Sequence, residues 1–141
     1  MASIKDLLSR AADYSLKQDN RSFWIGALGI RNDGAIVKSR NGSNDSISPE
    51  LHAEFRLSKK LDVGAEVYVA RLRRDTLDWA MARPCRMCRH ILKSKGVSVV
   101  YYTICENEYG VLDLSSFEEE GRPTGVKLER FSEGRWRRGA S

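Results

Sequence analysis

The stretch "PCRMCRHILKSKGVSVVYYTI", residues 84–104, contains the signals of a helix followed at once by a strand. Pro84 is typical of a first helical turn and Gly96 of the position just after a helix, so a helix is expected from Pro84 to about Lys95. The apolar run "VSVVYYTI" then predicts a buried strand. A helix leading into a buried strand indicates an α/β architecture.

The chain before this stretch predicts three more strands. "FWIGALGI" and "AIVKS" flank "RNDG", in which Asp33-Gly34 is a strong hairpin signal, so these two strands should be antiparallel neighbours. "AEVYVARL" predicts the third strand. After the buried strand only "ICENE" precedes the fifth, "EYGVLDL", so the last two strands should also form an antiparallel hairpin.

Two further helices are expected. Apolar residues recur at helical spacing from Ser3 to about Lys17, with Ser3 as a cap and Asp6 three residues on. Ser48 and Pro49 then predict the start of a helix that runs to about Lys60. The sequence therefore predicts a five-stranded mixed sheet with helices on both faces.

Length and composition favour one globular domain. The 141 residues are 41% hydrophobic and 30% charged, which argues against a disordered chain. We expect a single domain over residues 1–141, with its core at about 3–115 and a C-terminal extension with a basic tail at 116–141. No apolar run approaches the ~20 residues of a membrane helix, and the N-terminus lacks a signal-peptide core, so we expect a cytoplasmic protein.

The cysteines indicate a metal site. Three cysteines do not make a disulfide framework. On a helix that starts at Pro84, Cys85 and Cys88 share a face near the N-terminus, where thiolates are stabilised. His52 lies near the start of the preceding helix. A catalytic zinc takes three such ligands and leaves a fourth position to water, and Glu54 is placed to take a proton from that water.

These motifs resemble a known signature. "HAE" at residues 52–54 and "PCRMC" at residues 84–88 are similar to the H-x-E and P-C-x-x-C pattern of zinc-dependent nucleobase deaminases, the cytidine deaminase superfamily. "FWIGALGIRNDGAIVKSRN" also resembles the first hairpin of cytidine deaminases, so the likeness covers about residues 3–115. It implies a three-layer cytidine-deaminase-like fold, a zinc cofactor, hydrolytic deamination, and a homodimer or homotetramer.

The resemblance also implies substrate contacts. Asn41 would contact the sugar and Phe23 would pack near the pyrimidine. The backbone amides of Ala53 and Cys85 would help hold the ring and the zinc-bound oxygen. The carbonyl of Arg83, just before Pro84, would receive the leaving amino group.

Two positions depart from the family pattern. Ser43 stands where cytidine deaminases usually carry a second sugar-binding glutamate, which argues against plain ribonucleoside recognition. Arg83 stands where a small or acidic residue is usual, and Arg86 and Arg89 follow on the same helix. These arginines suit a phosphate-bearing substrate or simply a solvated helix face.

Several functions remain open at this point. The first is deamination of a free cytosine nucleoside or nucleotide (cytidine, deoxycytidine or dCMP). The second acts on single-stranded DNA or RNA, attracted by the net charge of +5 and the "RWRR" tail. The third is a non-catalytic module stabilised by zinc, for which His90 or Cys105 would be the spare ligand. We otherwise expect Cys105 to be a small core residue.

Overall fold

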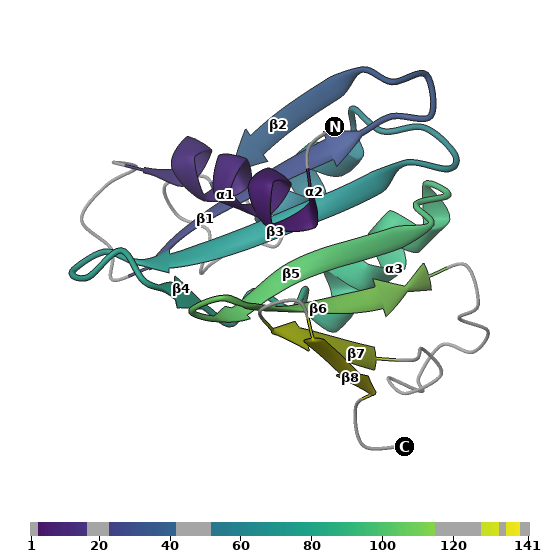
Figure 1. Cartoon of the computed structure of the whole chain (residues 1–141). Helices are drawn as coiled ribbons and strands as arrows, with labels where there is room; N and C mark the ends of the chain where they lie inside the picture. Colours follow the sequence, from purple (N-terminus) through teal and green to yellow (C-terminus); the bar gives the residue numbers. More distant parts are fainter. Residues whose placement is uncertain (1–2, 17–22, 42–51, 115–127, 133–134, 139–141) are drawn as a thin grey trace.

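The computed structural model describes residues 3–16, 23–41, 52–114, 128–132 and 135–138. A mixed β-sheet lies between helices (Figure 1), with α1 (Ile4–Ser15) on one face and α2 (Ala53–Ser58) and α3 (Arg86–Ser94) on the other. This arrangement confirms the mixed α/β fold that the sequence predicted. Among the described residues, no helix is long and apolar enough to cross a bilayer.

The sheet has more strands than predicted. Its order is β2-β1-β3-β5-β6-β7-β8, with β4 paired to β3. Only β3 and β5 pair in parallel. The prediction of five strands was wrong, because it missed β4, β7 and β8. The strands are β1 (Phe23–Ile30), β2 (Ile36–Arg40), β3 (Glu66–Arg73), β4 (Trp79–Ala80), β5 (Val99–Cys105), β6 (Glu108–Asp113), β7 (Leu128–Ser132) and β8 (Arg135–Arg138).

Both predicted hairpins are present. β1 and β2 pair antiparallel around the turn at Gly34, whose φ of +93° is a conformation that glycine adopts without strain. β5 and β6 also pair antiparallel, as the short "ICENE" connection predicted. In the region where the sequence predicted a C-terminal extension, β7 and β8 continue the sheet from β6.

The helix ends follow their capping residues. Ser3 and Asp6 form a reciprocal capping box at the start of α1, which confirms that expectation. α3 begins at Arg86 instead of Pro84, because Cys85 is its N-cap residue with an extended backbone. The predicted start of α2 at Pro49 lies outside the described residues.

Two apolar clusters hold the layers together. On the α1 side, Leu8 and Ala11 pack with Leu28 and Tyr68 of the sheet. On the other side, α2, α3 and the sheet share a cluster whose fully buried members are Ala27, Ala53, Leu57, Ala65, Val67, Val69, Leu92, Val100 and Leu112. The second cluster fixes the position of α2 relative to α3, and both helices carry motif residues at their N-termini.

Gly26 allows α1 to lie directly against β1. A Cβ atom added there would overlap the backbone oxygen of Ala11 and crowd Ser15. We expect Gly26→Ala to lower the free energy of unfolding by about 1–3 kcal/mol, because the helix must move away from the strand. Urea unfolding checks this, with Ser9→Ala as control, since Ser9 lies in α1 and is exposed. Equal stability of parent and Gly26→Ala would contradict the close packing.

Candidate functional site

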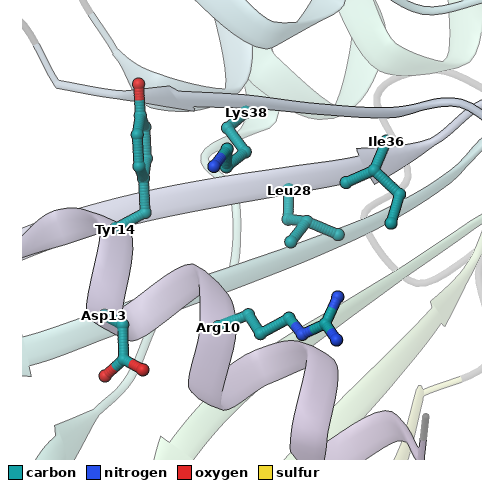
Figure 2. A pocket seen from close by; sticks show the side chains of 6 residues that line it. All are labelled: Arg10, Asp13, Tyr14, Leu28, Ile36 and Lys38. Atoms are coloured by element: carbon teal, nitrogen blue, oxygen red, sulfur yellow. The ribbon is translucent and has the colours of Figure 1, made fainter.

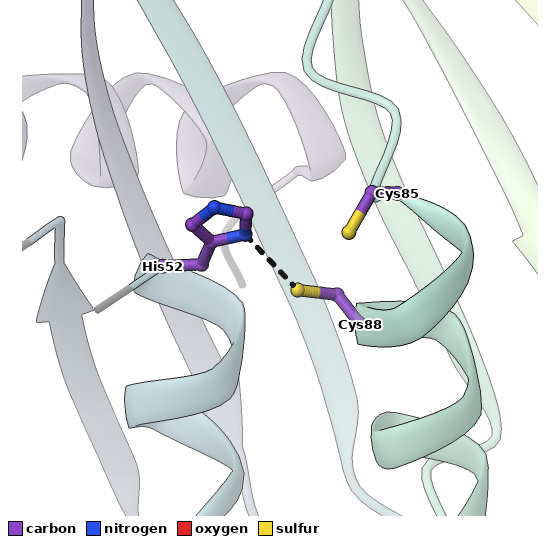
Figure 3. A group of neighbouring side chains, drawn as sticks. All are labelled: His52, Cys85 and Cys88. Atoms are coloured by element: carbon purple, nitrogen blue, oxygen red, sulfur yellow. Dashed lines mark hydrogen bonds between the residues drawn. The ribbon is translucent and has the colours of Figure 1, made fainter. Parts of the chain in front are cut away.

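Three potential metal ligands come together where α2 and α3 begin. His52 is the N-cap residue of α2 and Cys85 that of α3, while Cys88 lies in the first turn of α3. Figure 3 shows the three side chains converging, with 3.6 Å between Cys88 Sγ and His52 Nδ1. Their ligand atoms all lie within 4.8 Å of one another. One nitrogen and two sulfur donors at this separation fit zinc.

The two thiols differ in acidity. A hydrogen bond from the side chain of Cys88 stabilises the Cys85 thiolate and lowers the pKa of Cys85, whereas burial raises it. The Cys88 backbone N–H and His52 also lower this pKa, which falls to about 5. The Cys85 thiolate and burial in turn raise the pKa of Cys88. One thiolate is therefore already favoured at neutral pH, as a soft metal requires.

Glu54 lies beside the three ligands, in the first turn of α2. It is only 6% exposed, and burial raises the pKa of its carboxyl to about 7. The negative charge of Cys85 raises that pKa further, whereas His52 lowers it, so the carboxyl is close to both groups. A carboxyl that titrates near neutral pH suits a group that takes up and returns a proton.

The raised pKa of Glu54 predicts a pH-dependent stability in the protein stripped of metal. The folded form binds the proton more tightly than the unfolded form, whose carboxyl has the usual pKa of 4.5. The contribution of Glu54 to the free energy of unfolding should therefore fall by about 3 kcal/mol as the pH rises from about 4.5 to about 7.

The comparison to measure is parent against Glu54→Gln, by urea unfolding across this pH range. The free energies of unfolding of the two proteins must be subtracted, because Cys85 is present in both. Its lowered pKa makes its own contribution to the free energy of unfolding rise with pH. A difference that does not vary with pH would show that Glu54 titrates normally.

Asn41 holds the start of α2. It is buried, and its Oδ1 accepts a 2.6 Å hydrogen bond from the backbone N–H of Ala53. That N–H, which the resemblance assigned to the substrate ring, donates to Asn41 in this structure. Contacts of Asn41 and Ala53 with a substrate stay predictions, and Ser43 lies outside the described residues.

The segment before α3 brings several arginines together. Pro84 is buried, and its carbonyl accepts a hydrogen bond from the Arg89 guanidinium at 3.1 Å. Burial and the positive charges of Arg83 and Arg86 lower the pKa of Arg89. The Arg83 Nε atom is buried and has no hydrogen-bond partner among the described residues. The role of the Arg83 carbonyl also stays a prediction.

Sequence reasoning missed Arg71 of β3. Its guanidinium lies 4.3 Å from the centre of the Phe23 ring, and its positive charge lowers the pKa of Glu54. Within the part of the chain that the structure describes, its buried Nε has no hydrogen-bond partner, and its NH1 donates to the carbonyl of Met81 at 3.3 Å. The signal was present in strand alternation, which places Arg71 on the same face as the buried Val67 and Val69.

Comparison with known proteins decides the family. Residues 1–104 match the family described as the cytidine and deoxycytidylate deaminase zinc-binding region. The chain belongs to this deaminase family. No curated protein matches the chain. Among solved structures, a mutant cytidine deaminase from Mycobacterium tuberculosis is similar at 18% identity, covering 75% of this chain and 91% of that one, with a TM-score of 0.48.

Family and geometry agree on the cofactor. The matched region is a zinc-binding region, and it contains His52, Cys85 and Cys88, whose ligand atoms the structure brings together. Zinc is therefore the cofactor of this deaminase, and the hydrolytic chemistry of the family follows from it.

Proposed function

We propose that this deaminase hydrolyses the cytosine of a free nucleoside or nucleotide, such as cytidine, deoxycytidine or dCMP, to the uracil form with release of ammonia. The observation that carries the proposal is the buried Glu54 carboxyl beside the His52, Cys85 and Cys88 cluster. A buried carboxyl that titrates near pH 7 beside three zinc ligands suits hydrolytic deamination.

Different residues bind the metal and transfer the protons. His52, Cys85 and Cys88 would hold zinc, which when bound acts as a Lewis acid and lowers the pKa of water. Glu54 takes a proton from the attacking water and delivers it to N3 of the ring. It then passes the second proton to the amino group, the C4–N bond breaks and ammonia leaves. Water supplies the oxygen that C4 keeps, so cytosine plus water gives uracil plus ammonia.

Substrate contacts in the proposal come from the walls of the site. Phe23 would pack near the pyrimidine, and Arg71 across its ring supplies a cation for an electronegative group of the substrate. Asn41 would position the sugar from the start of α2, and the carbonyl of Arg83, before Pro84, would receive the departing amino group.

A substrate panel tests the proposal. Zinc-loaded protein is incubated separately with cytidine, deoxycytidine, their 5′-monophosphates and adenosine, and ammonia release is followed against Glu54→Gln as blank. We expect one or more cytosine compounds to be consumed and adenosine to be spared. Release of ammonia from adenosine alone would overturn the choice of base, while zinc binding without any turnover would favour a non-catalytic module.

A second candidate keeps the chemistry and places the cytosine in single-stranded DNA or RNA. One hollow beside α2 favours it, because five cationic side chains line that hollow: Lys38, Arg40, Arg56, Lys59 and Lys60. Adding a single-stranded oligonucleotide to the panel separates the two candidates, since ammonia release from it alone would select the polymer.

Assembly and location belong to the same proposal. From the family resemblance we expect a homodimer or homotetramer in the cytoplasm. Light scattering of the purified protein distinguishes these assemblies from a monomer.

A further inference from the structure

Five cationic side chains surround a hollow on the side of α2 that faces β2. The hollow has a volume of about 440 Å³ and is lined by Lys38 and Arg40 of β2 and by Arg56, Lys59 and Lys60 at the end of α2. We call it the basic hollow. None of its lining residues is acidic, and none of the five cations forms an ion pair with a described residue. Among the described residues, no carboxylate neutralises these five side chains, so this part of the structure presents a concentrated positive charge.

Several of these cations are held in place by neutral acceptors. Lys60 Nζ donates to the Lys38 carbonyl at 2.7 Å, and Arg56 NH1 donates to the Arg40 carbonyl at 3.0 Å. Arg40 NH1 donates to the carbonyl of Tyr14 at 3.3 Å. A backbone carbonyl restricts the side chain without cancelling its charge, so less conformational entropy is lost when an anion binds.

A second hollow adjoins the basic hollow along α1. It has a volume of about 330 Å³, shares Tyr14 and Lys38 with the basic hollow, and adds the cation Arg10 and the carboxylate Asp13. In Figure 2 the Lys38 ammonium lies near the Tyr14 ring, with its Nζ 5.1 Å from the ring centre, and the Arg10 guanidinium lies further along the same hollow. The cations of the basic hollow thus continue past one aromatic ring to Arg10, and Asp13 is the one acidic residue among the described residues that line the two hollows.

At its other end the basic hollow reaches the start of α2, the helix that carries Glu54. Asn41 lines the hollow and accepts the hydrogen bond from the N–H of Ala53, the residue after His52. A ligand in the basic hollow would therefore lie against the segment that carries a zinc ligand and Glu54.

We propose that the basic hollow binds the phosphodiester backbone of single-stranded nucleic acid. A mononucleotide carries too few charges to use cations on two elements and an adjoining hollow, whereas a strand presents one phosphate per nucleotide to successive cations. A positively charged groove with an aromatic side chain is typical of single-strand binding, because bases exposed in a single strand can stack on the ring. The site goes beyond the proposed function, since binding at the hollow is independent of turnover.

The test measures binding and its salt dependence. A fluorescent single-stranded oligonucleotide of about 15 nucleotides is titrated with zinc-loaded protein at several salt concentrations, and anisotropy gives the dissociation constant. If each cation of the basic hollow neutralises one phosphate, log K should fall against log salt with a slope of about −3.5. The titration is repeated with Glu54→Gln, so that turnover plays no part.

A pair of matched variants locates the site. In Lys38→Gln/Lys59→Gln two cations are lost whose side chains make no hydrogen bond to backbone among those described. We expect a slope of about −2.1 and binding about 25-fold weaker at about 0.1 M salt. The control Arg74→Gln/Lys95→Gln removes two exposed charges elsewhere, giving the same net charge of +3 from +5. It should bind like the parent.

Four outcomes would overturn the proposal. They are no binding at low salt, equal weakening in both double variants, tighter binding of a duplex than of the single strand, and equally strong competition by inorganic tripolyphosphate at the same phosphate concentration. The last would assign the basic hollow to a small polyphosphate. The ammonia assay is read separately, so failure of this site and failure of the deaminase proposal are distinguishable.

Discussion

Glu54→Gln is expected to lower the rate of deamination by about 10²–10⁴-fold while leaving zinc bound. The amide keeps the size of the side chain and its buried position in α2, but it does not take a proton from water or pass one to the ring. Because Glu54 is not one of the three clustered ligands, the metal content should not change. Ammonia release and zinc content measured on the same preparation check both halves of this expectation.

Glu106→Gln is the matched control, since Glu106 is an exposed carboxylate in the turn between β5 and β6. It should react at the rate of the parent. If Glu54→Gln reacted as fast as Glu106→Gln, Glu54 would have no catalytic role and another group would have to move the protons. Zinc binding without ammonia release by the parent or by Glu106→Gln would make a zinc-stabilised module the better description of the chain.

Local signals were sufficient to predict much of this architecture. The Asp33-Gly34 turn and the Ser3 and Asp6 box each act within a few residues, so they are readable in one sequence and appear as predicted. The apolar runs of β1, β3 and β5 are likewise long enough to be recognised. The motifs at residues 52–54 and 84–88 predicted that His52, Cys85 and Cys88 meet, because the family signature links two segments that are far apart in the chain. The spacing within either motif does not show that contact.

Features that depend on a partner strand were missed. β4 has only two residues and exists because Leu72 and Arg71 of β3 pair with it. Cys105 was expected in the core and is exposed, so that prediction was wrong. Cys105 is the last residue of β5, and strand alternation places it with the half-buried Val99 and Tyr101 instead of with the buried Val100 and Tyr102.

The basic hollow was missed for a similar reason. Its cations come from two short segments, residues 38–40 and 56–60, and neither contains an unusual run of charge. These cations come close to one another only because α2 packs against β2. From the sequence, nucleic-acid binding was attributed to the net charge and to the "RWRR" tail. The structure instead brings five cations together beside α2.

Replacing Cys88 with alanine is expected to remove zinc and activity together. Cys88 is the buried ligand of the cluster, and its sulfur lies 3.6 Å from His52 Nδ1, so its loss leaves only His52 and Cys85. Two ligands do not make the tetrahedral site that holds zinc tightly. Zinc content measured by mass spectrometry after dialysis should fall from about one ion per chain to near zero.

Cys105→Ala is the control that separates a catalytic from a structural zinc. The catalytic reading needs three protein ligands and a position for water, whereas a structural site needs four ligands. Cys105 ends β5 and is not a member of the described cluster, so its alanine variant should keep both zinc and turnover. Loss of zinc in Cys105→Ala would make Cys105 a fourth ligand, and with no position left for water the hydrolytic mechanism through Glu54 would no longer hold.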